Sequence, residues 1–271
     1  MLTFLFWNLN NKPIHALVAE LAESHEVDIL VLAECAIVSP TMLHELNSRQ
    51  SFGFSLAFSP SERIVIYTRF PSHWLSPIAD EDGLSIRHLI HPILEQEVLI
   101  VAAHLSSRFH RSGEELNQLA TRLGPLIEEA EESVGHRRTV IVGDLNMSPF
   151  DTGVASSEGL HGVMDRKIAE SISRKVNGKV RRLFYNPMWS RLGDESLGPP
   201  GTYFYNSSSS INHFWHIYDQ VLVRPDLLPY FRNEEMKVIT EVGTRSLMDG
   251  SGRPSRQEAS DHLPLLFRLT F

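Results

Sequence analysis

The amino-acid sequence predicts an α/β fold in a single globular domain, on three observations. Short runs of β-branched and aromatic residues, typical of strands, alternate along the chain with segments whose apolar residues recur at helical spacing. Hydrophobic residues make up 42% of the 271 residues and charged residues 21%, so there is ample apolar material for a core and no sign of wholesale disorder. The sequence contains no internal repeats. A single domain over residues 1–271 is therefore expected.

The first predicted elements are a strand, a helix and a second strand. Residues 3–7 form an apolar and aromatic run that predicts a strand. Pro13 then predicts the start of a helix, because proline is favoured at the first helical position and apolar residues recur at i, i+3, i+4 and i+7 from Ile14 to Leu21. The continuous apolar run at 29–32 predicts a buried strand.

The rest of the chain follows the same alternation. Strands are predicted at 54–58, 64–67, 85–90, 98–103, 139–142, 220–223 and 265–269. A helix is predicted over 113–132 from its apolar stripe, with a kink at Pro125. Residues 193–210 are rich in Gly, Pro and Ser and are expected to be loop, as is much of 151–186.

Charge limits the partners of the protein. The formal net charge of -8 argues against a surface that wraps nucleic acid through many phosphate contacts, so any polyanion must be bound locally. The clearly basic stretch lies at 166–182, and we interpret it as a solvated, mobile loop rather than a phosphate-contacting patch, because short charge runs usually serve solubility.

The sequence predicts no membrane anchor and a cytoplasmic location. Its apolar stretches fall short of the roughly 18 residues that cross a bilayer. The opening apolar run precedes the first basic residue, Lys12, which is the reverse of a secretory signal. A single cysteine, Cys35, cannot form an internal disulfide, in agreement with a reducing compartment.

Chemically competent side chains stand at the ends of predicted strands. Asn8, Glu34, His104 and Asp144 each follow an apolar strand, and ligands gather at the carboxyl ends of strands in layered α/β folds. Other candidates stand at the start of late strands: Asp219, Asp261 and His262. If those late strands run antiparallel to the others, all of these side chains share one edge.

Six segments resemble motifs of the endonuclease/exonuclease/phosphatase superfamily, in the expected order over nearly the whole chain. They are FWNLN at 6–10, LAE at 32–34, AAHL at 102–105, GDLN at 143–146, YDQVLV at 218–223 and SDH at 260–262. Each is weak alone, but their combination is specific. AAHL resembles the histidine-bearing branch, which includes pancreatic-type deoxyribonuclease, poly(A) deadenylases, inositol polyphosphate 5-phosphatases and neutral sphingomyelinases.

The resemblance implies a four-layer sandwich, with two mixed β-sheets packed face to face and helices outside. It also implies a Mg²⁺ or Mn²⁺ ion with Glu34 as its principal carboxylate ligand. Hard divalent cations prefer oxygen and keep several waters, so Asn10 and Asp261 can complete the set. The family often has an acid where this chain has Asn10, so the resemblance leaves open whether the site holds one metal ion or two.

The resemblance further implies roles in catalysis. His262 would be the general base, with Asp219 as the carboxylate that fixes its tautomer and stabilises the imidazolium. Asp144 would orient the attacking water or assist the leaving oxygen. Three further side chains would contact the phosphoryl oxygens, where donors stabilise developing charge: Asn8, Asn146 and His104. Two basic residues after the AAHL motif are candidate substrate contacts: Arg108 and Arg111.

The leading hypothesis is a metal-dependent nuclease that hydrolyses phosphodiester bonds of DNA or RNA. A phosphatase or phosphodiesterase acting on a small-molecule or lipid headgroup is the alternative, and a non-catalytic binding module is a third. The aromatic segment HFWHIY at 213–218 fits either a base-stacking surface or ordinary loop. Whether a nuclease of this kind would act at ends or internally stays open.

Overall fold

The computed structural model describes residues 1–49, 53–93, 96–106 and 113–271. Its first large sheet has the order β16-β19-β1-β2-β4-β3. The strands of this sheet are β1 (Leu2–Asn8), β2 (Ile29–Ala33), β3 (Ser55–Ala57), β4 (Ile64–Thr68), β16 (Lys237–Val238) and β19 (Leu265–Leu269).

The second large sheet has the order β5-β6-β7-β8-β15-β12-β9. Its strands are β5 (Leu75–Glu81), β6 (Leu84–Leu89), β7 (Val98–His104), β8 (Thr139–Asp144), β9 (Gly162–Val163), β12 (Phe184–Tyr185) and β15 (Asp219–Val223). Three small hairpins accompany the sheets: β10 (Ser173–Val176) with β11 (Lys179–Arg182), β13 (Tyr203–Phe204) with β14 (Trp215–His216), and β17 (Glu241–Val242) with β18 (Arg245–Ser246).

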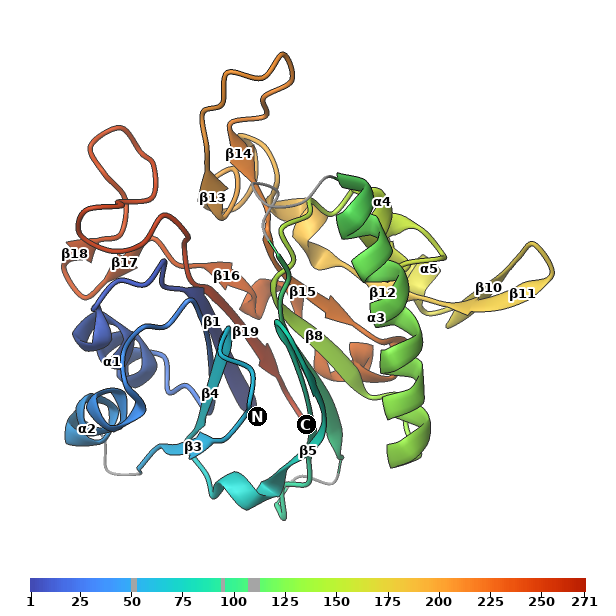
Figure 1. Ribbon diagram of the computed structural model, residues 1–271, viewed down its shortest axis with the longest axis horizontal. Coiled ribbons are helices and arrows are strands. Elements are labelled where there is room, and N and C mark those ends of the chain that lie inside the picture. The colour runs from blue at the N-terminus through green and yellow to red at the C-terminus, as the bar shows by residue number, and fades with distance from the viewer. Residues whose placement is uncertain (50–52, 94–95, 107–112) are drawn as a thin grey trace.

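Helices flank the two sheets on their outer sides (Figure 1). The α-helices are α1 (His15–Ser24), α2 (Ser39–Arg49), α3 (Gly113–Val134), α4 (Thr152–Ala155) and α5 (Arg166–Ala169). Short 3-10 helices lie at Ser72–Trp74, Pro187–Arg191, Pro225–Tyr230 and Asn233–Glu235. In Figure 1, α1 and α2 lie beside the sheet that contains β1, and α3 lies beside the sheet that contains β8. The predicted four-layer α/β sandwich is confirmed.

The side chains of β7 explain how the layers hold together. Val98, Ile100 and Ala102 pack into the core between the two sheets, and the intervening residues Leu99 and Val101 pack into a second core under α3. Because successive side chains of a strand point to opposite faces, a strand buried on both faces is apolar at every position. The same rule explains the continuous apolar runs of β1, β2 and β8.

Strand direction brings the predicted motifs to one edge. β2 runs parallel to β1, and β8 runs parallel to β7. β15 is antiparallel to β8, and β19 is antiparallel to β1. The late strands therefore start at the edge where the early strands end, as the shared-edge hypothesis requires.

The N-terminal boundary of the first helix differs from the prediction. Pro13 is not its first residue, since α1 begins at His15 with Ile14 as the N-cap. The backbone N–H of Ile14 donates to the carbonyl of Lys12 (2.9 Å), so this stretch forms a tight turn instead of a helical turn. The predicted helix at 113–132 extends to Val134 and continues through Pro125.

The expectation of loop over much of 151–186 was wrong. This region contains α4, β9, α5, β12 and the hairpin β10–β11. The hairpin carries most of the basic residues of 166–182 and extends away from the sheets in Figure 1. Asn177 and Gly178 connect β10 to β11, both with positive φ (48° and 81°). Asn-Gly is the preferred sequence for a two-residue hairpin turn with that backbone, so the signal was present in the sequence.

Six further strands were missed, namely β5, β13, β14, β16, β17 and β18. β5 pairs antiparallel with β6 and contains Pro77, which is tolerated because β5 is an edge strand. β13 lies within the predicted loop at 193–210, the rest of which is irregular. Among the described residues, no helix is both long and apolar enough to cross a membrane.

Candidate active site

The edge shared by the two sheets gathers the predicted catalytic residues. Asn8 ends β1 and Asp144 ends β8, and the Asn8 amide donates to the Asp144 carboxylate (Nδ2–Oδ2 3.0 Å). Asp219, the first residue of β15, lies opposite Asp144 in the antiparallel register. His262 precedes β19, and its Nε2 lies 3.8 Å from Asp144 Oδ2. Side chains far apart in sequence thus converge on one carboxylate.

His262 is held by a buried carboxylate. Its Nδ1 lies 3.0 and 2.9 Å from Oδ1 and Oδ2 of Asp219, and Asp219 is fully buried. Trp7 Nε1 donates to the carbonyl of His262 (2.9 Å), and the Tyr203 ring lies 4.5 Å from the imidazole ring. Because a carboxylate accepts only, Nδ1 carries a proton, and Nε2 is left to face Asp144.

The charges around His262 favour its protonated form. Burial alone would lower the pKa of the imidazole, but Asp219, Asp144 and Asp261 together raise it to about 10. Burial raises the pKa of Asp144, and the neighbouring Asp219 carboxylate acts in the same direction. The pair of groups that face each other across 3.8 Å is therefore a strongly perturbed acid–base pair, as is common at functional sites.

Glu34 follows β2 in an unusual backbone conformation. Its φ of 46° lies in the left-handed region, which is uncommon for a residue with a side chain and recurs at functional sites. His104 Nε2 lies 3.4 Å from the carboxylate, and this contact lowers the pKa of Glu34. The Asn8 amide also donates to Glu34 (3.4 Å). The Glu34 side chain is 33% exposed, so an ionised carboxylate with accessible surface faces the pocket.

Asn146 is positioned by its neighbours at the end of β8. Its backbone N–H donates to Asp144 Oδ1 (2.8 Å), and its side-chain amide donates to the carbonyl of Leu105 (2.9 Å). Its φ of 50° is again left-handed, a conformation that asparagine tolerates better than most residues. The GDLN motif therefore forms a tight, hydrogen-bonded turn beside the acid–base pair.

A pocket of about 600 Å³ opens at this edge. The predicted residues that line it are Glu34, Asn10, Asp261, Asp144, Asn146 and His262. His104, Asn8 and Asp219 lie directly behind them and contact Glu34, Asp144 and His262 through the distances given above. The candidate substrate contacts Arg108 and Arg111 lie outside the described residues.

An aromatic wall forms part of this pocket, and it includes two residues of the segment 213–218, for which a base-stacking surface was one of two hypotheses. Tyr203, Tyr205, His216 and Tyr218 line it. The rings of His216 and Tyr218 stack with centroids 4.8 Å apart, and Tyr203 stacks with Tyr218 at 5.5 Å. The pairing of β13 with β14 places Tyr203 opposite His216. The available sequence signal was the aromatic character of 203–205 and 213–218.

Two sets of side chains at this edge offer possible ligands for a divalent cation. Ligand atoms of Asp144, Asp219 and His262 lie within 4.8 Å of one another. Both Asp219 oxygens face His262 Nδ1, however, so this buried group is suited to proton transfer. The carboxylate of Glu34 is accessible and shares the pocket with oxygen-bearing Asn10 and Asp261, which suits a hard cation. The residues at the edge therefore fit the oxygen-ligand set inferred from the sequence.

The edge of the two-sheet sandwich thus combines an ordered His–Asp pair with an accessible carboxylate at one pocket. The model of the Endonuclease/Exonuclease/phosphatase family matches residues 5–262. The chain belongs to this family, and hence to the hydrolases that act on phosphate ester bonds. No curated protein sequence gives a significant match.

Solved structures of low sequence identity share the fold. A family protein from Bacteroides thetaiotaomicron has a TM-score of 0.60 at 14% identity, over 99% of this chain and 94% of that one. An AP endonuclease from Archaeoglobus fulgidus has a TM-score of 0.57 at 14% identity, over 100% of both chains. D. rerio TDP2 complexed with single strand DNA product has a TM-score of 0.56 at 16% identity, over 100% of this chain and 99% of that one.

Proposed function

We propose that this protein is a divalent-metal-dependent phosphodiesterase that hydrolyses DNA or RNA with water activated by His262, and that residues 1–271 act as one catalytic domain. The observation that carries the proposal is the orientation of His262. Asp219 holds its Nδ1, so Nε2 is directed at Asp144 beside the pocket that Glu34 lines.

The proton chemistry follows from this orientation. In its neutral form His262 accepts a proton from water at Nε2, and Asp219 stabilises the imidazolium that forms. The gap of 3.8 Å between His262 Nε2 and Asp144 Oδ2 is too long for a direct hydrogen bond, so Nε2 is available to accept a proton from water. The water oxygen forms the new bond to phosphorus as the bond to the leaving oxygen breaks. Asp144 would orient that water, or supply a proton to the leaving oxygen.

The remaining polar residues would hold the phosphate and position the acids. Asn146, which lines the pocket, and His104, which lies behind Glu34, would donate to phosphoryl oxygens. The Asn8 amide already donates to Asp144 and Glu34, so we assign it a positioning role.

Glu34 would be the principal ligand of a Mg²⁺ or Mn²⁺ ion, with oxygens of Asn10 and Asp261 completing the protein ligands. Such an ion polarises a phosphoryl oxygen and offsets its negative charge. The accessible, ionised carboxylate of Glu34 supports this assignment. The contact between Glu34 and His104 keeps the carboxylate in its charged form, because it lowers the Glu34 pKa.

The aromatic wall supports a nucleic-acid substrate. Bases stack on aromatic side chains with little dependence on sequence, and Tyr203, Tyr205 and Tyr218 line the pocket next to His262. No lysine or arginine is found among the described residues that line the pocket, which disfavours a highly phosphorylated ligand. The pocket volume also suits a small phosphate ester, so a small-molecule phosphatase or phosphodiesterase is the second candidate.

Substrate specificity and the base can be tested together. Purified protein is incubated with single-stranded DNA, RNA, plasmid and inositol phosphates, with Mg²⁺ or with chelator. We expect chelator-sensitive cleavage of nucleic acid, and His262→Ala to lower kcat by about 10²–10⁴-fold, the usual contribution of a general base. The matched control is His44→Ala, a change at an exposed histidine of α2.

Other outcomes would contradict the proposal. His262→Ala activity within about tenfold of wild type would remove the general-base assignment. Cleavage that persists in chelator would reject the metal requirement. Turnover of inositol phosphates alone would favour the small-molecule candidate, and no turnover of any substrate would favour a binding module.

A further inference from the structure

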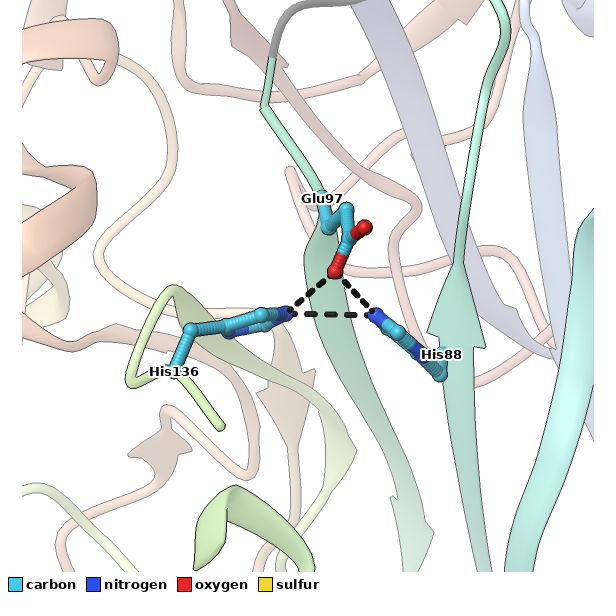
Figure 2. A group of neighbouring side chains, drawn as sticks. All are labelled: His88, Glu97 and His136. Atoms are coloured by element: carbon cyan, nitrogen blue, oxygen red, sulfur yellow. Dashed lines mark hydrogen bonds and ion pairs between the residues drawn. The ribbon is translucent and has the colours of Figure 1, made fainter. Parts of the chain in front are cut away.

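A second cluster of titratable side chains (Figure 2) lies outside the sheet edge that carries His262, Asp144 and Glu34, which we call the catalytic edge. His88 Nε2 is 3.0 Å from Glu97 Oε2 and 3.2 Å from His136 Nε2. His136 Nε2 is 3.7 Å from the same Glu97 oxygen. Figure 2 shows the three side chains, from separate segments, directed at one point. The cluster is the other group of potential metal ligands found among the described residues.

The cluster lies at the opposite end of the sheet from His262. Glu97 directly precedes β7 and His136 lies just before β8, whereas His104 and Asp144 end those same strands. β7 has 7 residues, which at about 3.3 Å per residue separates the two ends by roughly 20 Å. The ligands of the catalytic edge therefore cannot reach the cluster.

The backbone around the cluster is firmly held. Arg138 Nε donates to the carbonyl of Glu97 (2.7 Å), and the N–H of Leu99 donates to the carbonyl of Arg138 (2.8 Å). His88 belongs to β6, where it pairs with Leu99 of β7. The two histidine side chains are 11% and 6% exposed, and Glu97 is 44% exposed. These features make a preorganised site that is open on the carboxylate side.

Hydrogen bonding alone does not satisfy the three facing atoms. The N–H of Arg138 donates to His136 Nδ1 (3.2 Å), which puts the proton of a neutral His136 on Nε2. If His88 Nε2 also carries a proton for Glu97, two N–H groups face each other across 3.2 Å. If it carries none, its lone pair faces the Glu97 carboxylate at 3.0 Å. A cation that accepts all three lone pairs removes the conflict among these three atoms, although the Arg138 N–H then loses Nδ1 of His136 as its acceptor.

We propose that His88, Glu97 and His136 bind a late transition-metal ion, with Zn²⁺ as the best fit, at a site separate from the catalytic edge. Two imidazole nitrogens and one carboxylate oxygen form a ligand set suited to zinc, with water in the fourth position, whereas Mg²⁺ prefers oxygen ligands. The ion would tie the end of β6 to the segments that lead into β7 and β8. Its expected role is to stabilise the sheet.

The protonation state of His136 favours this assignment. Burial lowers its pKa to about 4, and Arg138 and His88 act in the same direction. The ring is therefore neutral at pH 7, so a metal ion does not have to displace a proton from an imidazolium. Binding at Nε2 moves the ring proton to Nδ1, at the expense of the contact with the Arg138 N–H.

Zinc binding to the full chain tests the proposal. Equilibrium dialysis at low micromolar free Zn²⁺, with millimolar Mg²⁺ present to compete for oxygen ligands, is followed by metal analysis. We expect wild type to bind one Zn²⁺ at this site and its Tm to rise with zinc. His88→Gln, Glu97→Gln and His136→Gln should each lower zinc affinity, by at least about 100-fold for a lost histidine, since even loss of a residue supporting a ligand costs 10–100-fold.

Two control variants separate this site from others. His44→Gln, at an exposed histidine of α2, should bind zinc as wild type does. His262→Gln should also retain the site, because His262 lies at the other end of the sheet. Circular dichroism checks that each variant folds. A ¹H–¹⁵N spectrum of the imidazoles should show His136 changing from the Nε2–H to the Nδ1–H tautomer when zinc is added to wild type.

Several results would overturn the proposal. The proposal fails if the wild-type protein binds no zinc under these conditions. It also fails if the His88→Gln and His136→Gln variants fold and bind zinc as tightly as the wild-type protein. Zinc lost from His262→Gln alone would assign the ion to the catalytic edge instead. If one histidine variant fails to fold, the other variant and the tautomer of His136 in wild type decide the question.

Discussion

The contact between His262 and Asp219 concentrates opposite charges in a buried place. Burial favours the neutral imidazole, whereas three nearby carboxylates favour the imidazolium, and the balance raises the His262 pKa to about 10. The pKa of a base is matched to its task when it lies near the working pH. Charge at the edge, including any cation bound near Glu34, therefore sets how readily His262 accepts a proton.

Asp219→Asn tests this balance directly. In metal-free protein we expect the His262 pKa, followed by NMR, to fall from about 10 toward its ordinary value of 6.5, because the closest charge has been removed. Because folding raises the His262 pKa, protonation of His262 stabilises the native state, and this stabilisation is fully present below about pH 6.5. It is lost as the pH rises through about 10. The variant should show a smaller loss of unfolding free energy over this interval. An unchanged His262 titration would contradict the assignment.

Glu34→Gln tests the proposed metal ligand. The amide keeps the shape of the side chain but removes its charge, so we expect the Mg²⁺ concentration for half-maximal activity to rise by about tenfold or more. Glu23→Gln, at an exposed position of α1, is the matched control. A Mg²⁺ titration identical to that of wild type would place the ion elsewhere.

At the scale of the elements, the end of β8 depends on close approach of two backbones. Gly143 has a φ of 153°, and a Cβ there would lie 1.8 Å from the carbonyl oxygen of Ala103 in β7. Only glycine permits this approach, which sets the positions of His104 and Asp144 at the ends of their strands. The glycine of GDLN is thus required by the packing of two strands.

Gly143→Ala should therefore disrupt both stability and activity. We expect the unfolding free energy, measured with urea, to fall by at least about 2 kcal/mol, in the range typical of overpacking, and activity to be lost. Gly250→Ala is the control, because a Cβ at that position meets nothing within 4 Å. A Gly143→Ala variant with wild-type activity and stability would show that the strands can separate without cost.

At the scale of the whole molecule, a buried ion pair joins the outer helix to the second sheet. Arg224, which follows β15, donates to Glu131 of α3 (Nε–Oε1 2.7 Å). Glu131 also accepts from Thr139 at the start of β8 (2.8 Å), and the guanidinium lies 3.8 Å from the centroid of the Phe184 ring. This network lies at the end of β8 remote from Asp144.

Glu131→Ala should lower the unfolding free energy by about 3–5 kcal/mol, because it leaves a buried guanidinium without its partner. Urea unfolding measures this change, and Glu129→Ala, at an exposed position of the same helix, should stay within about 0.5 kcal/mol of wild type. We expect kcat to be retained below the unfolding temperature. A stability loss under about 1 kcal/mol would contradict the role given to the pair.

The sequence by itself determined the layer architecture and most of the residues that meet at the candidate site. Periodicity of two or of 3.6 is set by neighbours along the chain, so β1, β2, β7 and β8 were predictable. Polar residues that interrupt apolar strands, such as Glu34 and Asp144, marked the edge. The prediction of loop over 151–186 overlooked the turn signal of Asn177 and Gly178. The strand β13 was missed because two residues are too short to show a periodic pattern.

Only the tertiary structure decided which distant residues meet. The antiparallel direction of β15 and β19 brings Asp219 to His262, and nothing in either local segment specifies that direction. The aromatic wall around Tyr203 and the cluster of His88, Glu97 and His136 likewise join residues with no diagnostic spacing. The physical reason is that strand order and direction follow from burying whole apolar faces together, which depends on the entire chain at once.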